Sequence, residues 1–170
     1  LVENDKLSNS DFPFPQYDLY NWYLQLGSLK NVNEKYFKGK LPSWNDFTKH
    51  PNHDEYWIKA STLTYINKPQ IPILHVGGYF DQEDLNGPQL MYNHLEKKDV
   101  SNNNFICLGP WNHGGWESKN ADSLGEIKFG SNTSAWFQAF EKKWFDYWLK
   151  GQGEGKFAEA NCFQTGSNTW

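Results

Sequence analysis

The sequence contains no long hydrophobic run, since no window approaches the roughly eighteen consecutive apolar residues that indicate a transmembrane helix. Its N-terminus has no basic segment followed by an apolar core, so no signal peptide is visible. Basic residues are also scarce: 16 Lys and Arg stand against 20 Asp and Glu, for a net charge of −4. Such a balance provides no positive field for nucleic acid. We therefore expect neither a membrane nor a nucleic-acid partner.

Cysteine is scarce too, with only Cys107 and Cys162 in 170 residues. Two cysteines either pair or stay free, and Cys107 stands inside an apolar run, where a buried free thiol is common. Cysteine usage leaves the compartment open, and a bacterial periplasmic or secreted location is compatible with it. The chain also begins without methionine, which suggests a processed chain or a piece of a longer one.

The sequence lacks a serine in a Gly-x-Ser-x-Gly context, and it lacks a glycine-rich phosphate loop. Without that strand-to-helix turn, none of its serines is a credible activated nucleophile. A metal site is not indicated either, because His50 and His53 have no cysteine pair or third histidine at ligand spacing. We predict no metal and no cofactor.

Aromatic side chains, in contrast, make up 18% of the residues. Residues 1–66 show helical patterns and no strand, which is typical of a cap or lid. Aromatic residues and leucines recur at helical spacing over 17–29, and another helix is predicted for 54–61. Between them, Ser43 and Asp46 have the spacing of a capping box at a helix start.

Residues 67–152 predict a strand–helix–strand unit of an α/β fold. The apolar runs Ile71–Val76 and Asn104–Leu108 are typical of buried parallel strands. The helix between them is predicted to begin at an Asp84 cap and to end near Lys97.

Two further segments complete the chain. Residues 134–150 carry tryptophans and phenylalanines at helical spacing, and Gly151 is a suitable terminator for that helix. Residues 153–170 begin as a glycine-rich linker and continue with the alternation of a single strand. The predicted segments are therefore a cap, an α/β core and the opening of another domain.

Two polar residues with catalytic chemistry follow the predicted strands. Asp81 comes after the first strand, and His113 comes after the second. Open α/β sheets place their active sites past the carboxyl ends of parallel strands. The order of acid before histidine matches the second half of the Ser…Asp…His order of α/β-hydrolases. Glu83 and Asp84 compete with Asp81 as the acid, but Asp81 stands closest to the strand end.

Several motifs in order resemble the CocE/NonD acyl-esterase family. They are G-G-Y-F-D-Q-E-D at 77–84, G-P-W-N-H-G at 109–114, F-D-Y-W-L-K-G at 145–151, H-P-N-H-D-E-Y-W at 50–57 and F-Q-T-G-S-N-T-W at 163–170. This family includes α-amino-acid ester hydrolases, proteins named glutaryl-7-aminocephalosporanic acid acylases, and S15-type Xaa-Pro dipeptidyl-peptidases. The resemblance covers nearly all of the chain after about residue 11.

The resemblance implies the fold and the roles of individual residues. The chain is expected to be the C-terminal half of an α/β-hydrolase domain, with part of a helical cap and the first strand of a jelly-roll β-sandwich at 163–170. Asp81 is then the triad acid and His113 the triad base. Substrate-binding roles are implied for the acids Asp54 and Glu55, which match a cluster for the substrate's α-ammonium, and for Tyr79, Glu83 and Trp111.

The expected function is part of a serine hydrolase that cleaves esters or amides of small acyl donors through an acyl-enzyme. The nucleophile serine is expected in an N-terminal remainder of the same protein, so the 170 residues alone are predicted to be inactive. A homo-oligomer is compatible with this interpretation. Two alternatives stay open: an aromatic-rich carbohydrate-binding module, and a structural remnant in which Asp81 and His113 are not within hydrogen-bond reach.

Overall fold

The computed structural model describes residues 14–170, and the chain forms two compact units, residues 1–64 and 65–170. Residues 1–13 of the predicted cap lie outside the described range. None of the helices in residues 14–170 has the length and apolar character needed to cross a bilayer.

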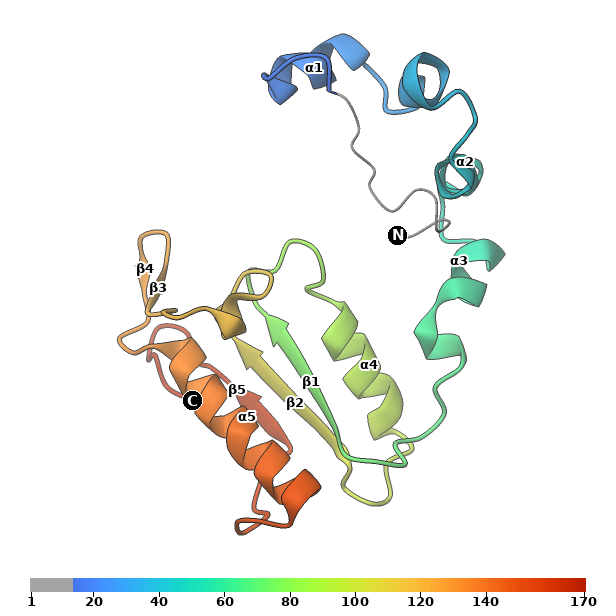
Figure 1. Cartoon of the computed structure of the whole chain (residues 1–170). Coiled ribbons are helices and arrows are strands. Elements are labelled where there is room, and N and C mark those ends of the chain that lie inside the picture. The colour runs from blue at the N-terminus through green and yellow to red at the C-terminus, as the bar shows by residue number, and fades with distance from the viewer. Residues whose placement is uncertain (1–13) are drawn as a thin grey trace. The chain divides into compact units, whose positions relative to one another are not determined.

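The first unit is helical over its described residues (Figure 1). Its elements are α1 (Leu19–Leu26), a π-helical turn (Asn33–Phe37), α2 (Pro42–Lys49), α3 (Glu55–Ala60) and a 3-10 turn (Thr62–Thr64). Helix α1 begins at Asp18, whose side chain accepts the backbone N–H of Asn21 at 3.2 Å. Trp22 and Leu26 of this helix form a small core with Val32, which follows the helix.

The capping box predicted at the start of α2 is wrong, because the observed cap is Leu41, two residues before Ser43. The helix begins at Pro42, and Leu41 at the cap position makes no side-chain hydrogen bond. Proline at the first helical position has a suitable fixed φ and lacks an N–H that would have no partner there. Ser43 is therefore already inside the first turn. Helix α3, in contrast, is capped by Asp54, which accepts the N–H of Tyr56 at 3.0 Å.

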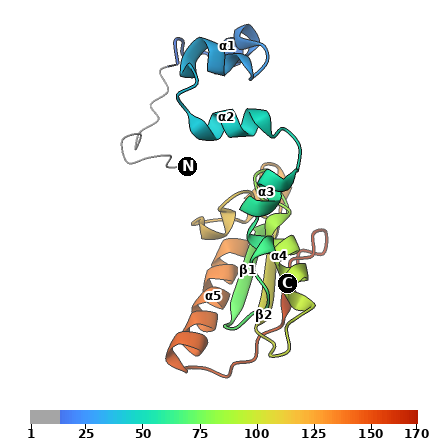
Figure 2. The ribbon, with the colours of Figure 1, turned by 90° about the vertical axis from the view of Figure 1, so that its right-hand side faces the viewer.

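The second unit is built on a parallel sheet of β1 (Ile73–Gly78), β2 (Asn104–Gly109) and β5 (Ala160–Cys162), in that order. Helix α4 (Gly87–Glu96) connects β1 to β2, and α5 (Thr133–Lys150) precedes β5. The two helices cover opposite faces of the sheet, as the view of Figure 2 shows. The α/β prediction is confirmed for this unit.

Helix α4 begins two residues later than predicted, because its cap is Asn86 and not Asp84. It starts at Gly87, and Asn86 at its cap makes no side-chain hydrogen bond. Asp84 still serves the helix start, because its Oδ1 accepts the N–H of Gly87 at 3.0 Å. The difference arises because the backbone N–H of Asp84 is itself bonded to the carboxylate of Asp81 at 2.9 Å, which holds residues 81–84 in a turn.

The strand within 153–170 also differs from its predicted place. Ala160–Cys162 pairs in parallel with residues 106–108 of β2, so it extends the hydrolase-like sheet. In the described residues after β5, the only β pairing is an isolated bridge between Gln164 and Thr169. The jelly-roll β-sandwich stays a prediction.

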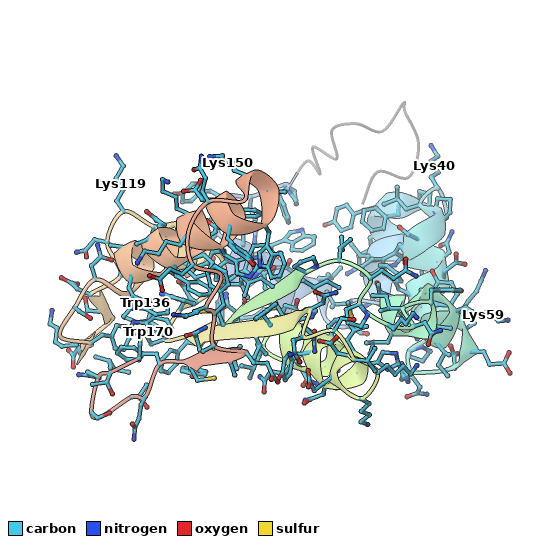
Figure 3. All side chains as sticks on the ribbon, turned by 90° about the horizontal axis from the view of Figure 1, so that it is seen from below. Lys40, Lys59, Lys119, Trp136, Lys150 and Trp170 are labelled. Carbon is cyan, nitrogen blue, oxygen red and sulfur yellow. The ribbon has the colours of Figure 1, made fainter. Side chains whose placement is uncertain are left out.

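The main core of the second unit lies between the sheet and α5. Cys107 of β2, Trp111, Ala121 and Phe137 of α5 are buried together. Figure 3 labels Trp136 of α5 and Trp170, whose rings stack with centroids 3.7 Å apart. The aromatic residues of α5 are thus mainly core residues, and they fix the loops that leave the carboxyl ends of β1 and β2.

Candidate active site

The loops that follow β1 and β2 are held together by their backbones. Tyr79 N–H donates to the carbonyl of Gly109 at 2.9 Å, and Phe80 N–H donates to the carbonyl of Trp111 at 3.0 Å. Gly78 allows this approach, because a Cβ there would lie 2.2 Å from the Trp111 carbonyl oxygen. The residue directly after this junction on the first loop is Asp81.

The carboxylate of Asp81 is buried and fully engaged. Only 2% of its side chain is exposed. Its Oδ1 accepts the backbone N–H groups of Glu83 at 2.8 Å and Asp84 at 2.9 Å. Its Oδ2 lies 3.0 Å from Nδ1 of His113. Nδ1 of His113 also lies 3.2 Å from Oδ1, so Oδ1 is shared between the loop and the imidazole, and Oδ2 contacts the imidazole alone.

His113 completes the pair from the second loop. The chain turns after it at Gly114, which has φ of 71°, a left-handed conformation that favours glycine. Because the carboxylate accepts, Nδ1 of His113 carries a hydrogen, and the neutral ring leaves Nε2 without one. The side chain is 51% exposed, so Nε2 is open to accept a proton from a nucleophile.

The two groups shift each other's titration in opposite directions. The N–H of Asp84 lowers the pKa of Asp81 most, with help from the N–H of Glu83 and from His113. The hydrogen bond with Asp81 raises the pKa of His113, and the negative charges of Asp81 and Glu83 add to that rise. The arrangement favours an ionised acid beside a histidine that is basic enough to take a proton near neutral pH.

We expect His113 in the folded chain to titrate above the value of about 6.5 typical of histidine. A folded pKa above the unfolded one stabilises the fold below the unfolded pKa, and that contribution is lost as pH rises through the folded pKa. For Asp81 the sign is opposite, so its contribution is lost as pH falls through its folded pKa. An NMR titration of the His113 ring and urea unfolding at several pH values would check both. Titration of His113 at or below about 6.5 would contradict the expectation.

Glu83 lies on the other side of the imidazole. Its Oε2 is 3.9 Å from Nε2 of His113, and 64% of its side chain is exposed. The structure therefore brings three of the predicted residues together: Asp81, His113 and Glu83. Their common position was predictable only in part, because the spacing along the chain does not say which acid would meet which nitrogen.

Trp111 is a correction to the predicted substrate-binding set. Only 1% of its surface is exposed, and its indole N–H donates to the hydroxyl of Thr133 at 2.9 Å. The ring packs against Phe137 of α5. Trp111 therefore supports the His113 loop from inside the core and has no face for a substrate.

Tyr79 is half-buried and lies toward β5. Burial, followed by the neighbouring Cys162 thiol, raises the pKa of Tyr79 to about 12. Its phenol thus stays neutral, and its nearest polar partner lies in the sheet. A role of Tyr79 in substrate binding stays a prediction.

Trp116 is a residue that the sequence did not single out. Its ring lies edge-on to His113, with centroids 6.5 Å apart, and is only partly exposed. It also contacts Trp111, at 6.2 Å between ring centroids. The sequence feature that could have identified Trp116 is its position, three residues after His113 in an otherwise polar loop.

Asp54 and Glu55 belong to the first unit, and the site above belongs to the second. Asp54 is engaged twice, as the cap of α3 and through Oδ2, which lies 2.7 Å from Nδ1 of His50. That contact lowers the pKa of Asp54. Glu55 has a side chain that is 90% exposed and a 3.7 Å pair with Lys59. Of the two acids, Glu55 has the freer carboxylate.

Within residues 14–170, no three His, Cys, Asp or Glu side chains gather as a metal site.

Comparisons with known proteins give a consistent result. A model of the family described as X-Pro dipeptidyl-peptidase (S15 family) matches residues 14–115. The solved structure of an aminopeptidase from the marine sediment archaeon Thaumarchaeota archaeon has a TM-score of 0.80 and 30% identity, over 91% of this chain and 26% of its own. An α-amino acid ester hydrolase has a TM-score of 0.79 and 25% identity, over 89% of this chain and 25% of its own. The chain thus spans about a quarter of each structure. No curated protein matches the sequence.

Proposed function

Because the chain belongs to the X-Pro dipeptidyl-peptidase (S15) family, we propose that it supplies the acid and the base of a serine hydrolase, Asp81 and His113. This membership, with the likeness to the two solved hydrolases, confirms the resemblance inferred from the sequence motifs. The observation that carries the proposal is the 3.0 Å contact between Oδ2 of Asp81 and Nδ1 of His113. That contact leaves Nε2 as the reactive nitrogen.

The proposed reaction is acyl transfer to a serine and then to water. Nε2 of His113 takes the serine proton as the serine oxygen attacks the acyl carbon, and then gives that proton to the leaving atom. Asp81 keeps the proton on Nδ1 and stabilises the imidazolium that forms in between. Water repeats the sequence to release the acid. The substrates proposed are esters or amides of small acyl donors.

The serine is proposed to come from an N-terminal part of the same protein, outside the 170 residues. Two observations support this: the chain contains no Gly-x-Ser-x-Gly turn, and it matches about a quarter of two longer hydrolases. Neither of the other functions considered gains support. Of the tryptophans in residues 14–170, only Trp148 is exposed, at 36%, whereas a carbohydrate-binding surface needs a row of exposed rings. A structural remnant predicted that Asp81 and His113 would be out of reach.

The expected result for the 170-residue chain alone is no burst of p-nitrophenol from a p-nitrophenyl ester and no labelling by a serine-directed phosphonate. A polypeptide that also contains the proposed serine is expected to show both. Stopped-flow absorbance and mass spectrometry of the labelled chain would measure this. A stoichiometric burst from the 170 residues alone would overturn the placement of the serine elsewhere.

A further inference from the structure

We propose that Trp116 is a positioning residue for the acid–base pair, and that its ring confines the His113 imidazole so that Nε2 keeps its direction toward the reacting atoms. The inference rests on the proposed function, since it requires His113 to carry the proton between the serine and the leaving group. The observation behind it is an edge-to-face arrangement of the two rings, with centroids 6.5 Å apart and planes at 69°. Trp116 follows His113 by three residues, so one loop supplies both rings.

The hydrogen bond to Asp81 does not by itself fix the direction of Nε2. Nδ1 of His113 lies 3.0 Å from Oδ2 and 3.2 Å from Oδ1, so the ring can turn between the two oxygens and keep a hydrogen bond. A hydrogen bond also tolerates a deviation of about 30° from linearity with little loss. Because 51% of the histidine side chain is exposed, close packing does not stop such turning on every side. A rigid neighbouring ring can limit it.

Trp116 is itself held at its backbone and at its ring. Its backbone lies in a 3-10 turn (Gly115–Glu117), and Gln138 of α5 donates to the carbonyl of Ser118 at the end of that turn, at 3.2 Å. Its ring packs edge-on against Trp111, with centroids 6.2 Å apart, and Trp111 is only 1% exposed. The ring of Trp116 thus connects a fixed core to a half-exposed imidazole.

Proton transfer is sensitive to the direction of Nε2. This nitrogen must reach the serine proton at hydrogen-bond distance and afterwards the leaving atom. Misplacement of a catalytic group by about 1 Å can cost about 10²-fold in rate. An imidazole that turns away for part of the time therefore lowers kcat and leaves the affinity for substrate unchanged. A tryptophan that bound substrate would instead act on KM.

The test uses the complete hydrolase and a p-nitrophenyl ester. We expect Trp116→Ala to lower kcat by about 10- to 100-fold, with KM close to that of the wild type. Trp116→Phe keeps an aromatic ring beside His113 and should restore most of that loss. NMR of the hydrogen on Nδ1 of His113 gives a second readout. Its downfield signal should broaden or disappear in Trp116→Ala, through faster exchange with solvent, and persist in Trp116→Phe.

Trp136→Ala is the matched control, because Trp136 is also a partly buried tryptophan packed against the same core. Its ring stacks on Trp170 and Phe140. We expect this variant to keep the kcat and the Nδ1 signal of the wild type. If Trp116→Ala does not fold, Trp116→Leu takes its place, since leucine keeps apolar volume against the core without a ring.

Three results would contradict the inference while leaving the hydrolase intact. The first is a kcat and an Nδ1 signal that stay unchanged when the ring of Trp116 is removed. The second is a loss of kcat in Trp136→Ala as large as in the Trp116 variant, which would indicate general loosening of the core. The third is a raised KM with unchanged kcat, which would make Trp116 a substrate-binding residue. Absence of any hydrolysis by the wild type would instead overturn the proposed function.

Discussion

If the complete protein is the proposed serine hydrolase, replacement of Asp81 by asparagine is expected to lower its kcat by about 10⁴-fold. The reason lies in how the carboxylate is held. Oδ1 accepts two backbone N–H groups, from Glu83 and Asp84, so the amide oxygen of an asparagine must take that place. The amide NH₂ then occupies the Oδ2 position, 3.0 Å from Nδ1 of His113.

An NH₂ group in that position reverses the hydrogen bond to the imidazole. We expect Nδ1 to accept from this NH₂ at 3.0 Å rather than donate to the amide oxygen at the Oδ1 position, 3.2 Å away. The ring proton then moves to Nε2, where it prevents acceptance of the serine proton. The imidazolium also loses the negative charge that stabilises it. The variant should therefore retain its fold and its KM while losing kcat.

The measurements are kcat and KM with a p-nitrophenyl ester, together with an NMR titration of His113. Loss of the carboxylate should lower the pKa of His113 relative to the wild type, since Asp81 is the largest cause of its rise. Glu126→Gln serves as the control, because Glu126 is not among the acids that raise the pKa of His113. A kcat within a factor of about ten of the wild type would exclude Asp81 as the triad acid.

The acid–base pair was the part of the site most accessible from the sequence. Two apolar runs that end in glycine and then in a polar residue are local features, and parallel strands bring such ends to one edge of a sheet. The identification of Asp81 over Asp84 also depended on a local feature, its distance from the strand end. The structure adds why both are needed: the N–H of Asp84 helps to hold the Asp81 carboxylate.

Features that depend on long-range packing were harder to predict from the sequence. Residues 160–162 alternate like any short strand, and only their pairing with β2 places them in the hydrolase-like sheet. Trp111 stands between proline and the His113 loop, where a tryptophan is as compatible with a pocket wall as with a core. Its burial depends on α5, which brings Thr133 and Phe137 to it from more than twenty residues later.

Replacement of Trp111 by alanine is expected to lower the free energy of unfolding by about 3–5 kcal/mol, the usual cost of removing a buried aromatic ring. The ring is 1% exposed and contacts Phe137, Trp116 and Trp170, so its removal leaves a cavity beneath the His113 loop. Trp111→Phe should cost less than Trp111→Ala, because phenylalanine keeps part of the buried ring. It still loses the hydrogen bond to Thr133, so some destabilisation is expected.

Urea unfolding of the 170-residue chain, followed by circular dichroism, measures these losses. Trp148→Ala is the matched control, since that tryptophan lies on α5 with 36% of its surface exposed and should cost markedly less. A substrate-binding tryptophan would behave differently: its removal would raise KM of the complete hydrolase and leave the unfolding midpoint near that of the wild type. A loss of unfolding free energy no larger than that of Trp148→Ala would favour the original prediction that Trp111 binds substrate. A loss of the expected size identifies it as the support on which the His113 loop rests.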